Sequence, residues 1–380
     1  MSSFKVTVER LEIHPHPNAD ALELAQVALY RAVVPKGVYT SGDYAVYIPE
    51  QAVLPQSLIE ELDLVGRLAG KEKNRVKAIR LRKELSQGIV CRPKALSHIW
   101  DGMHTWVGAR ELLDQDYAET LGITKWVPPV PVHLSGKTVH APNLVRWVDI
   151  ENIKRYPDIF APGEQVVATE KIHGTCHLFT YDAETGTSHV ASKGIGAQQL
   201  ALVETDGNVY WRAARSHALW GAAVTLTGHL KDAFEGGIRA VGLFGEVYGK
   251  GIQDLHYGKD AATDGTLGYA LFDVAVVDGS GRQHWLSAPD LDDIWAVDMG
   301  EVGPLITVPR VPVVYEGPYD YTVLAGLAEG KSLLDPSTIR EGLVVRPKWE
   351  RYSPSLGGRA IGKIVSAGYL TRGGEATEYE

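Results

Sequence analysis

The chain has 380 residues, a length that accommodates two domains. Hydrophobic residues make up 44% and charged residues 22% of the sequence, which is ordinary for a folded protein with a buried core and excludes a low-complexity chain. The net charge is −9, so the surface as a whole is not suited to bind a polyanion. No apolar run approaches membrane-spanning length, the amino terminus lacks the apolar segment of a signal peptide, and the two cysteines, Cys91 and Cys176, lack metal-ligand spacing. We therefore expect a cytoplasmic protein.

Short strand-like runs separated by glycine and proline fill residues 1–95. Alternation of apolar and polar residues indicates half-buried strands, and residues 57–64 suit a short helix. Five short strands in this length predict a small all-β Greek-key barrel, and the OB-fold is the commonest such module that binds nucleic acid. The strand-like runs are 4–13, 22–34, 44–48, 75–82 and 88–91.

The basic residues of this region gather in one segment, 67–84, which we call the basic stripe. It holds eight basic and two acidic residues, a charge of +6 that leaves −15 for the rest of the chain. The stripe is predicted to follow the fourth strand and its lead-in, with a bulge near Ala78–Ile79. A local positive patch on an acidic protein fits a nucleic-acid contact, although a solvated strand face gives the same pattern.

The segment from His14 to Asp20, with its two His-Pro pairs, predicts a turn. It resembles the opening of stand-alone transfer-RNA-binding OB domains, which carry a similar His-Pro-x-Ala-Asp-x-Leu sequence. Its two histidines do not indicate a metal site, because no carboxylate or cysteine completes a ligand set.

Residues 96–147 are less regular, and we interpret them as a linker that packs on both domains. Strands and glycine turns dominate residues 148–380, which predict an α+β domain built on antiparallel sheets, with a helix at 211–221 or 224–234. The strands expected there are 165–168, 240–248, 269–277, 341–347 and 360–366.

A candidate nucleophile follows the first of these strands. Lys171 is followed by Ile172, His173, Gly174 and Thr175, and the glycine allows a tight turn beside a ligand. A lysine amine has an ordinary pKa of about 10.4, so it attacks phosphorus only where burial or neighbouring cations favour its neutral form. Taken alone, the pattern is more typical of an exposed lysine at the end of a strand.

Further residues suited to a nucleotide pocket follow Lys171 on the later strands. Each residue alone is weak evidence, because an acid beside a glycine is usually a turn. Their order along the chain is specific. The residues are Lys193, Glu246, Phe272, Glu341 and Lys363.

At this point the sequence resembles the covalent nucleotidyltransferases, the superfamily of ATP-dependent DNA and RNA ligases and messenger-RNA capping enzymes. Residues 170–175 resemble motif I in the histidine form typical of RNA ligases, and the match extends over roughly residues 150–370. Only 17 residues follow Lys363, which leaves no room for the carboxy-terminal OB domain of DNA ligases. The amino-terminal barrel instead resembles that of a small group of RNA ligases. The remaining matches are 192–194 (motif Ia), 244–249 (III), 269–273 (IIIa), 341–346 (IV) and 362–365 (V).

The resemblance implies an RNA ligase that seals 3′-OH/5′-phosphate breaks in three steps. Lys171 attacks the α-phosphate of ATP to form lysyl-AMP, AMP passes to an RNA 5′-phosphate, and a 3′-hydroxyl then displaces AMP. The implied partner is RNA or a nicked RNA-containing duplex, bound by the basic stripe and the nucleotidyltransferase face of a monomer, in RNA repair.

The resemblance also implies a role for each residue. Lys363 contacts the α-phosphate, and Mg²⁺ or Mn²⁺ is held by Glu341 and His173 through water. The nucleotide contacts implied are Glu170 (adenine amino group), Glu246 (ribose) and Phe272 (adenine stacking), together with His173 (phosphate or metal-bound water), Gly174 and Lys193.

Two alternatives stay open. A capping guanylyltransferase would use GTP, and a transfer-RNA-binding OB protein could carry an inactive nucleotidyltransferase domain. Motif V also departs from the family, which often has two lysines separated by one residue. Here Ile361 stands at the first position, so Lys363 acts alone or with another residue such as Arg359.

Overall fold

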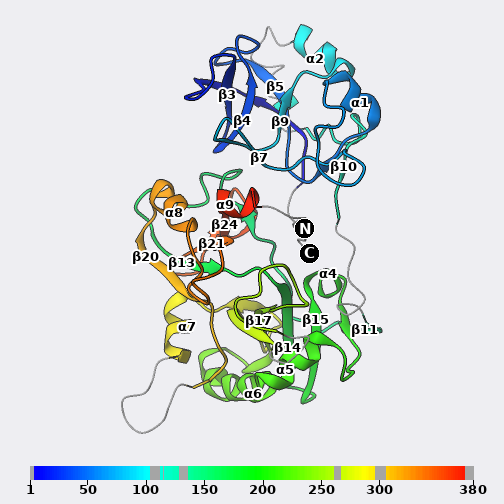
Figure 1. Cartoon of the computed structure of the whole chain (residues 1–380). Helices are drawn as coiled ribbons and strands as arrows, with labels where there is room; N and C mark the ends of the chain where they lie inside the picture. The colour runs from blue at the N-terminus through cyan, green and yellow to red at the C-terminus, as the bar shows by residue number, and fades with distance from the viewer. Residues whose placement is uncertain are drawn as a thin grey trace. The chain divides into compact units, whose positions relative to one another are not determined.

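The computed structural model describes residues 4–102, 112–113, 115–127, 136–260, 267–295 and 305–372, and the chain divides into two compact units (Figure 1). The first unit contains residues 1–127 and 153–157, and the second contains 128–152 and 158–380. The mixed α+β architecture with antiparallel sheets confirms the predicted fold class. The described part of residues 96–147 divides between the two units, while 103–111, 114 and 128–135 lie outside the described residues.

Two three-stranded antiparallel sheets form most of the first unit. One has the order β1-β5-β9 and the other β2-β3-β4. The predicted run 22–34 is two strands, because Ala28 takes a left-handed conformation (φ 49°) and turns the chain between them. The strands are β1 (Thr7–Arg10), β2 (Glu12–Pro15), β3 (Leu22–Val27), β4 (Tyr30–Pro35), β5 (Tyr44–Ile48) and β9 (Ile89–Cys91).

The described part of the first unit also contains short strand pairs and helices. Apolar side chains from the β1-β5-β9 sheet and from the segments around residues 96–99 and 117–123 share one buried core, which includes Val8, Val46 and Ile99. The elements are the pairs β6 (Ala52–Val53) with β10 (Thr124–Lys125) and β7 (Ile79–Leu81) with β8 (Glu84–Ser86), the helices α1 (Gln56–Glu61) and α2 (Ser97–Gly102), and the 3-10 turn Lys94–Leu96.

Only residues 79–81 and 84 of the basic stripe lie in strands, and the rest is turns, isolated bridges and irregular chain, which corrects the prediction of one strand over residues 75–82. Val76 and Ala78 are buried, whereas all three residues of β7 are exposed. The alternation of buried and exposed residues therefore ends just before the strand begins. At the tip of the β7–β8 hairpin, Arg82 (φ 47°) and Lys83 (φ 78°) both take left-handed conformations.

The His14–Asp20 segment supports this hairpin. His16 is buried, and its Nε2 donates to the Leu81 carbonyl at 3.2 Å while its Nδ1 accepts from the Asn18 amide at 3.1 Å. The Asn18 side chain donates in turn to Glu84 Oε1 at 3.4 Å. Both ring nitrogens of His16 are therefore used in holding the hairpin to this turn.

Two five-stranded sheets build the second unit. Their orders are β12-β24-β21-β13-β20 and β15-β14-β17-β18-β19, antiparallel except for the parallel pair β12 and β24. The first sheet contains β12 (Glu151–Asn152), β13 (Gln165–Lys171), β20 (Val313–Pro318), β21 (Gly342–Pro347) and β24 (Gly362–Val365). The second contains β14 (Thr175–Asp182), β15 (Thr187–Ser192), β17 (Ile238–Tyr248), β18 (Gly268–Asp278) and β19 (Gln283–Trp285).

The chain passes from one sheet to the other between β13 and β14, through residues 172–174 alone. Gly174 is required at this crossing because a Cβ there would lie 2.2 Å from the Val247 carbonyl oxygen of β17. Lys171 is thus placed at the junction of the two sheets.

Helices cover the second sheet. One helix was predicted at 211–221 or 224–234. The structure has two, α5 (Val209–Ser216) and α6 (Leu219–Leu230), which are separated at Ala218 in a left-handed conformation (φ 50°). These two helices lie against β15, β14 and β17 (Figure 1). No described helix is both long and apolar enough to cross a membrane. The remaining elements are α4 (Lys193–Gly196), the 3-10 turn Lys231–Ala233, α7 (Ala288–Trp295), α8 (Tyr321–Ala328), α9 (Ala367–Leu370), and the pairs β11 (Thr138–His140) with β16 (Leu200–Leu202) and β22 (Tyr352–Ser353) with β23 (Gly358–Arg359).

Candidate active site

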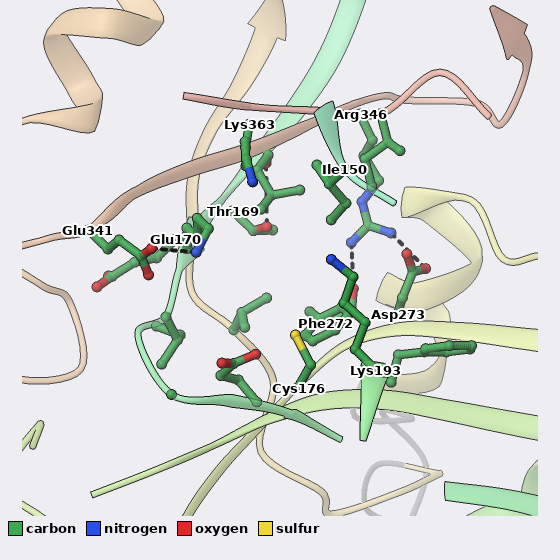
Figure 2. Close-up of a pocket in the computed structure, with 18 of the residues that line it drawn as sticks. Ile150, Thr169, Glu170, Cys176, Lys193, Phe272, Asp273, Glu341, Arg346 and Lys363 are labelled. Carbon is green, nitrogen blue, oxygen red and sulfur yellow. Dashed lines mark hydrogen bonds and ion pairs between the residues drawn. The ribbon is translucent and has the colours of Figure 1, made fainter. Parts of the chain in front are cut away.

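The predicted site residues come together in one pocket of the second unit, to which both sheets contribute (Figure 2). Lys171 and Lys363 belong to the first sheet, where Thr169, Val344 and Lys363 occupy one row across three strands. Because alternate residues of a strand share a face, Lys171 and Lys363 project from the same side of that sheet. The predicted residues that line the pocket are Glu170, Lys171, His173, Gly174, Lys193, Glu246, Phe272, Glu341 and Lys363.

Lys171 forms an ion pair with Glu341. The Nζ of Lys171 donates to Oε1 of Glu341, whose side chain is 1% exposed. The other oxygen, Oε2, is buried and has no hydrogen-bond partner among the described residues. A buried acceptor without a donor is costly, so this carboxylate is suited to a further cationic or hydrogen-bonding ligand.

Both ring nitrogens of His173 are already occupied by protein groups. Nε2 lies 2.6 Å from Asp254 Oδ1 and Nδ1 lies 2.9 Å from the Tyr369 hydroxyl, and the side chain is 3% exposed. Hydrogen bonds from His173 and Arg372 outweigh burial and hold the pKa of Asp254 well below its usual range. Both nitrogens are thus engaged by protein groups in this structure, and the contact of His173 with phosphate or metal-bound water stays a prediction.

Glu246 is a buried carboxyl on β17. Burial raises its pKa to about 8; Lys171 opposes this rise and the neighbouring Glu341 charge adds to it. Burial, reinforced by the charge of Glu246, also raises the pKa of the adjacent Cys176 thiol well above its usual range. Glu246 can therefore hold a proton near neutral pH, which would let it both donate to and accept from vicinal hydroxyls.

A buried charge cluster lies on the Phe272 side of the pocket. Arg346 donates to the Phe272 carbonyl at 2.9 Å and to Asp273 at 3.2 Å. Arg359 donates to Asp273 and to both oxygens of Glu350, at 2.6 and 2.7 Å, and lies 4.3 Å from the Trp285 ring centroid. The Arg359 guanidinium is thus bound by two carboxylates, which limits its capacity to substitute for the missing motif V lysine.

Lys193 and Glu170 complete the polar lining. The amines of Lys193 and Lys363 point toward the middle of the pocket (Figure 2), and Lys193 also pairs with Asp149 at 3.0 Å. Glu170 Oε2 accepts from the Leu333 amide at 2.8 Å, whereas its Oε1 is buried and without a hydrogen-bond partner among the described residues. Oε1 is an acceptor available to a donor such as an exocyclic amine.

The donor set fits a hydrated divalent ion rather than a metal cage. Within the described ranges, no group of three or more His, Cys, Asp or Glu side chains is arranged to hold a metal. Mg²⁺ usually keeps several waters and needs only one or two carboxylates. The unpartnered oxygen of Glu341 meets that requirement.

Sequence reasoning missed the groups that hold His173. Asp254 lies in a loop after β17, and Tyr369 and Arg372 follow motif V by only a few residues. No periodicity or motif marks them, so their connection with His173 emerges only from the tertiary structure.

Comparison with known proteins supports the fold. A family model described as RNA ligase matches residues 164–365, and one described as an OB-fold domain matches residues 5–93. None of the curated proteins is significantly similar in sequence. The chain is similar in structure to an arginine-to-alanine variant of Naegleria gruberi RNA ligase with ATP and Mn, at 22% identity and a TM-score of 0.73, covering 97% of this chain and 98% of that one. A glutamate-to-alanine variant of the same ligase, with AMP and Mn, matches at 23% identity and a TM-score of 0.72 with the same coverage.

Proposed function

The chain belongs to the RNA ligase family, and we propose that it is an ATP-dependent ligase that joins RNA 3′-hydroxyl and 5′-phosphate ends through a lysyl-AMP intermediate. The observation that carries this proposal is the placement of Lys171 and Lys363 on one face of a sheet, at the pocket where that sheet meets the second one. The similar Naegleria ligase structures, which contain ATP or AMP with Mn, support the choice of nucleotide and metal.

In the first step Lys171 attacks the α-phosphorus of ATP and pyrophosphate leaves. The ammonium of Lys171 must first release a proton to solvent, and the carboxylate of Glu341, to which Nζ already donates, holds the nitrogen in place. Lys363 and Lys193 neutralise charge on the phosphoryl oxygens, because preorganised cations stabilise a phosphoryl transition state without reorganising. Gly174 lets the backbone approach the nucleotide.

The base and ribose contacts follow from the other lining groups. We assign Phe272 to stacking on adenine and Glu246 to the ribose hydroxyls. Glu170 Oε1 would accept from the adenine 6-amino group, whereas guanine would present its O6 to the same carboxylate, so the pocket favours ATP over the GTP of a capping enzyme.

A divalent ion, Mg²⁺ or Mn²⁺, held by Glu341 through water, would supply positive charge at the α-phosphate and favour the neutral form of Lys171. The other partner is RNA, which we propose contacts the basic stripe of the OB-fold unit. We also propose a cytoplasmic monomer, a setting that suits two free cysteines.

The test is covalent labelling of the protein with radiolabelled ATP and Mn²⁺. Wild type is expected to retain label after denaturation and Lys171→Ala is not, because Lys171 is the proposed nucleophile and both nitrogens of His173, the other nitrogen base of the motif, are engaged by protein groups. The same variant should still seal a pre-adenylylated RNA strand, since that step does not use the lysine as nucleophile. Labelling by GTP in place of ATP would favour the capping reaction, and normal labelling of Lys171→Ala would overturn the proposal.

A further inference from the structure

The segment 366–372 reaches His173, a residue of the pocket lining, without lining the pocket itself. It follows β24 directly, and Ser366 fixes it by accepting from the Tyr369 amide at 3.0 Å and donating to the Arg340 carbonyl at 2.9 Å. Tyr369 is consequently 1% exposed, and its hydroxyl reaches His173, 196 residues earlier in the chain.

Arg372 closes a ring of contacts around His173. It donates to Asp254 at 3.0 and 3.2 Å and to the Tyr369 carbonyl at 2.8 Å, and its guanidinium lies 3.6 Å from the Tyr369 ring centroid. Asp254 binds His173 Nε2, so the imidazole is held at both nitrogens by groups that also hold each other. We call Asp254, Tyr369 and Arg372 the histidine clamp.

The backbone of the loop 172–174 is held by two side chains from the segment that contains Asp254. The Tyr257 hydroxyl accepts from the His173 amide at 2.8 Å, and the Gln253 side chain donates to the Gly174 carbonyl at 3.2 Å. Since residues 172–174 alone join Lys171 to β14, restraint of His173 and Gly174 restrains the lysine as well.

We propose that the histidine clamp positions His173, and through it the Lys171 nucleophile, for reaction with ATP; the inference rests on the proposed ligase function. A carboxylate accepts only, so Asp254 places the imidazole proton on Nε2. In that tautomer Nδ1 is the acceptor for the Tyr369 hydroxyl. Glu341 Oε2 lies 3.9 Å from Nδ1 but receives no hydrogen bond from it, so this oxygen remains an acceptor for another ligand. Tyr369, Arg372 and Asp254 are positioning residues, since none of them needs to touch the nucleotide.

The experiment compares Tyr369→Phe with Tyr319→Phe. The control removes another buried hydroxyl of the same unit, one without a hydrogen-bond partner among the described residues. We expect Tyr369→Phe to slow Lys171 adenylylation at saturating ATP by about tenfold or more, because the Nδ1 acceptor loses its donor. The half-saturating ATP concentration and the sealing of pre-adenylylated RNA should match those of the control.

Nitrogen-15 NMR of the imidazole supplies a readout independent of activity. In wild type His173 should carry its proton on Nε2 with Nδ1 as acceptor, and Tyr369→Phe should shift the Nδ1 resonance while Tyr319→Phe does not. If Tyr369→Phe does not fold, Arg372→Ala is compared with Arg372→Lys, which is expected to restore part of the rate.

Two results would overturn the inference: adenylylation by Tyr369→Phe at the rate of Tyr319→Phe, or a wild-type His173 with its proton on Nδ1. Failure of the wild-type protein to take label from ATP would instead count against the proposed function, and the NMR result would still decide whether the clamp sets the histidine proton.

Discussion

Glu246 shows how burial gives one residue of the pocket a pH-dependent role. Its carboxyl lies under the nucleotide pocket beside Glu341, and its pKa rises from an ordinary 4.5 to about 8 because burial disfavours the charged form. The folded protein therefore holds a proton that the unfolded chain has already released between these two values. Stability must fall as the pH rises through this window.

We predict that Glu246→Gln removes this pH dependence. The amide is neutral at every pH, so the free energy of unfolding of wild type should drop relative to the variant between pH 5 and 8, by at most about 1.4 kcal/mol per pH unit. Denaturant titrations of both proteins at several pH values measure the difference. Parallel profiles would show that Glu246 is ionised throughout, and its proposed donation to the ribose would be withdrawn.

The residues of the pocket were largely predictable because the chemistry requires particular side chains at particular strand ends. Lys171, Glu246, Phe272, Glu341 and Lys363 all line the one pocket. Their individual roles stay predictions. The hydrogen-bond partners of His173 were not predictable, because they come from a loop and a terminal segment that carry no sequence pattern.

At the scale of elements, local alternation located most strands but misjudged the basic stripe. The pattern through residues 75–82 predicts one strand, yet Val76 and Ala78 are buried. Arg75 forms only isolated bridges, and the β7–β8 ladder begins at Ile79. Tertiary packing thus shortens the strand and leaves a hairpin whose tip is basic. Arg75, by contrast, lies 4.0 Å from the Trp126 ring centroid and is half-buried, so it contributes less to the exposed charge.

The hairpin tip allows a test of the proposed RNA contact. A two-residue turn with both residues left-handed favours Asn-Gly, so Arg82→Asn with Lys83→Gly should relieve strain while removing two exposed charges. We predict unchanged or higher thermal stability but weaker RNA binding. The slope of log affinity against log salt should fall by roughly 0.7–0.9 for each RNA phosphate that the variant no longer neutralises.

The matched control for the hairpin is Arg67→Ser with Lys71→Ser, which removes the same charge from the exposed turn of the stripe outside the hairpin. An equal loss of salt dependence in this second variant would mean that RNA contacts the whole stripe and not the hairpin in particular. An unchanged slope in both variants would mean that the stripe is a solvated surface and does not contact RNA.

At the scale of the whole molecule, the proposed chemistry belongs to the second unit and the proposed RNA contact belongs to the first. Every predicted site residue and the whole histidine clamp belong to the second unit. The chain nevertheless returns to the first unit at residues 153–157, where Ile153 is fully buried and the Leu29 amide donates to the Lys154 carbonyl at 3.1 Å. A fragment without the first unit must therefore accommodate this returning segment.

We predict that a chain lacking residues 1–127, with Ile153→Ser to replace the apolar side chain that the deletion uncovers, still forms lysyl-AMP. Its pocket is complete, so labelling by ATP should proceed at nearly the full-length rate. Sealing of a nicked RNA duplex should fall sharply, because the fragment lacks the surface proposed to hold the strand. Full-length protein with Ile153→Ser is the control, and circular dichroism establishes that the fragment is folded. If a folded fragment took no label, the first unit would have to contribute to the nucleotide reaction itself. If it sealed nicks as well as the control, the OB-fold unit would have no part in binding the substrate.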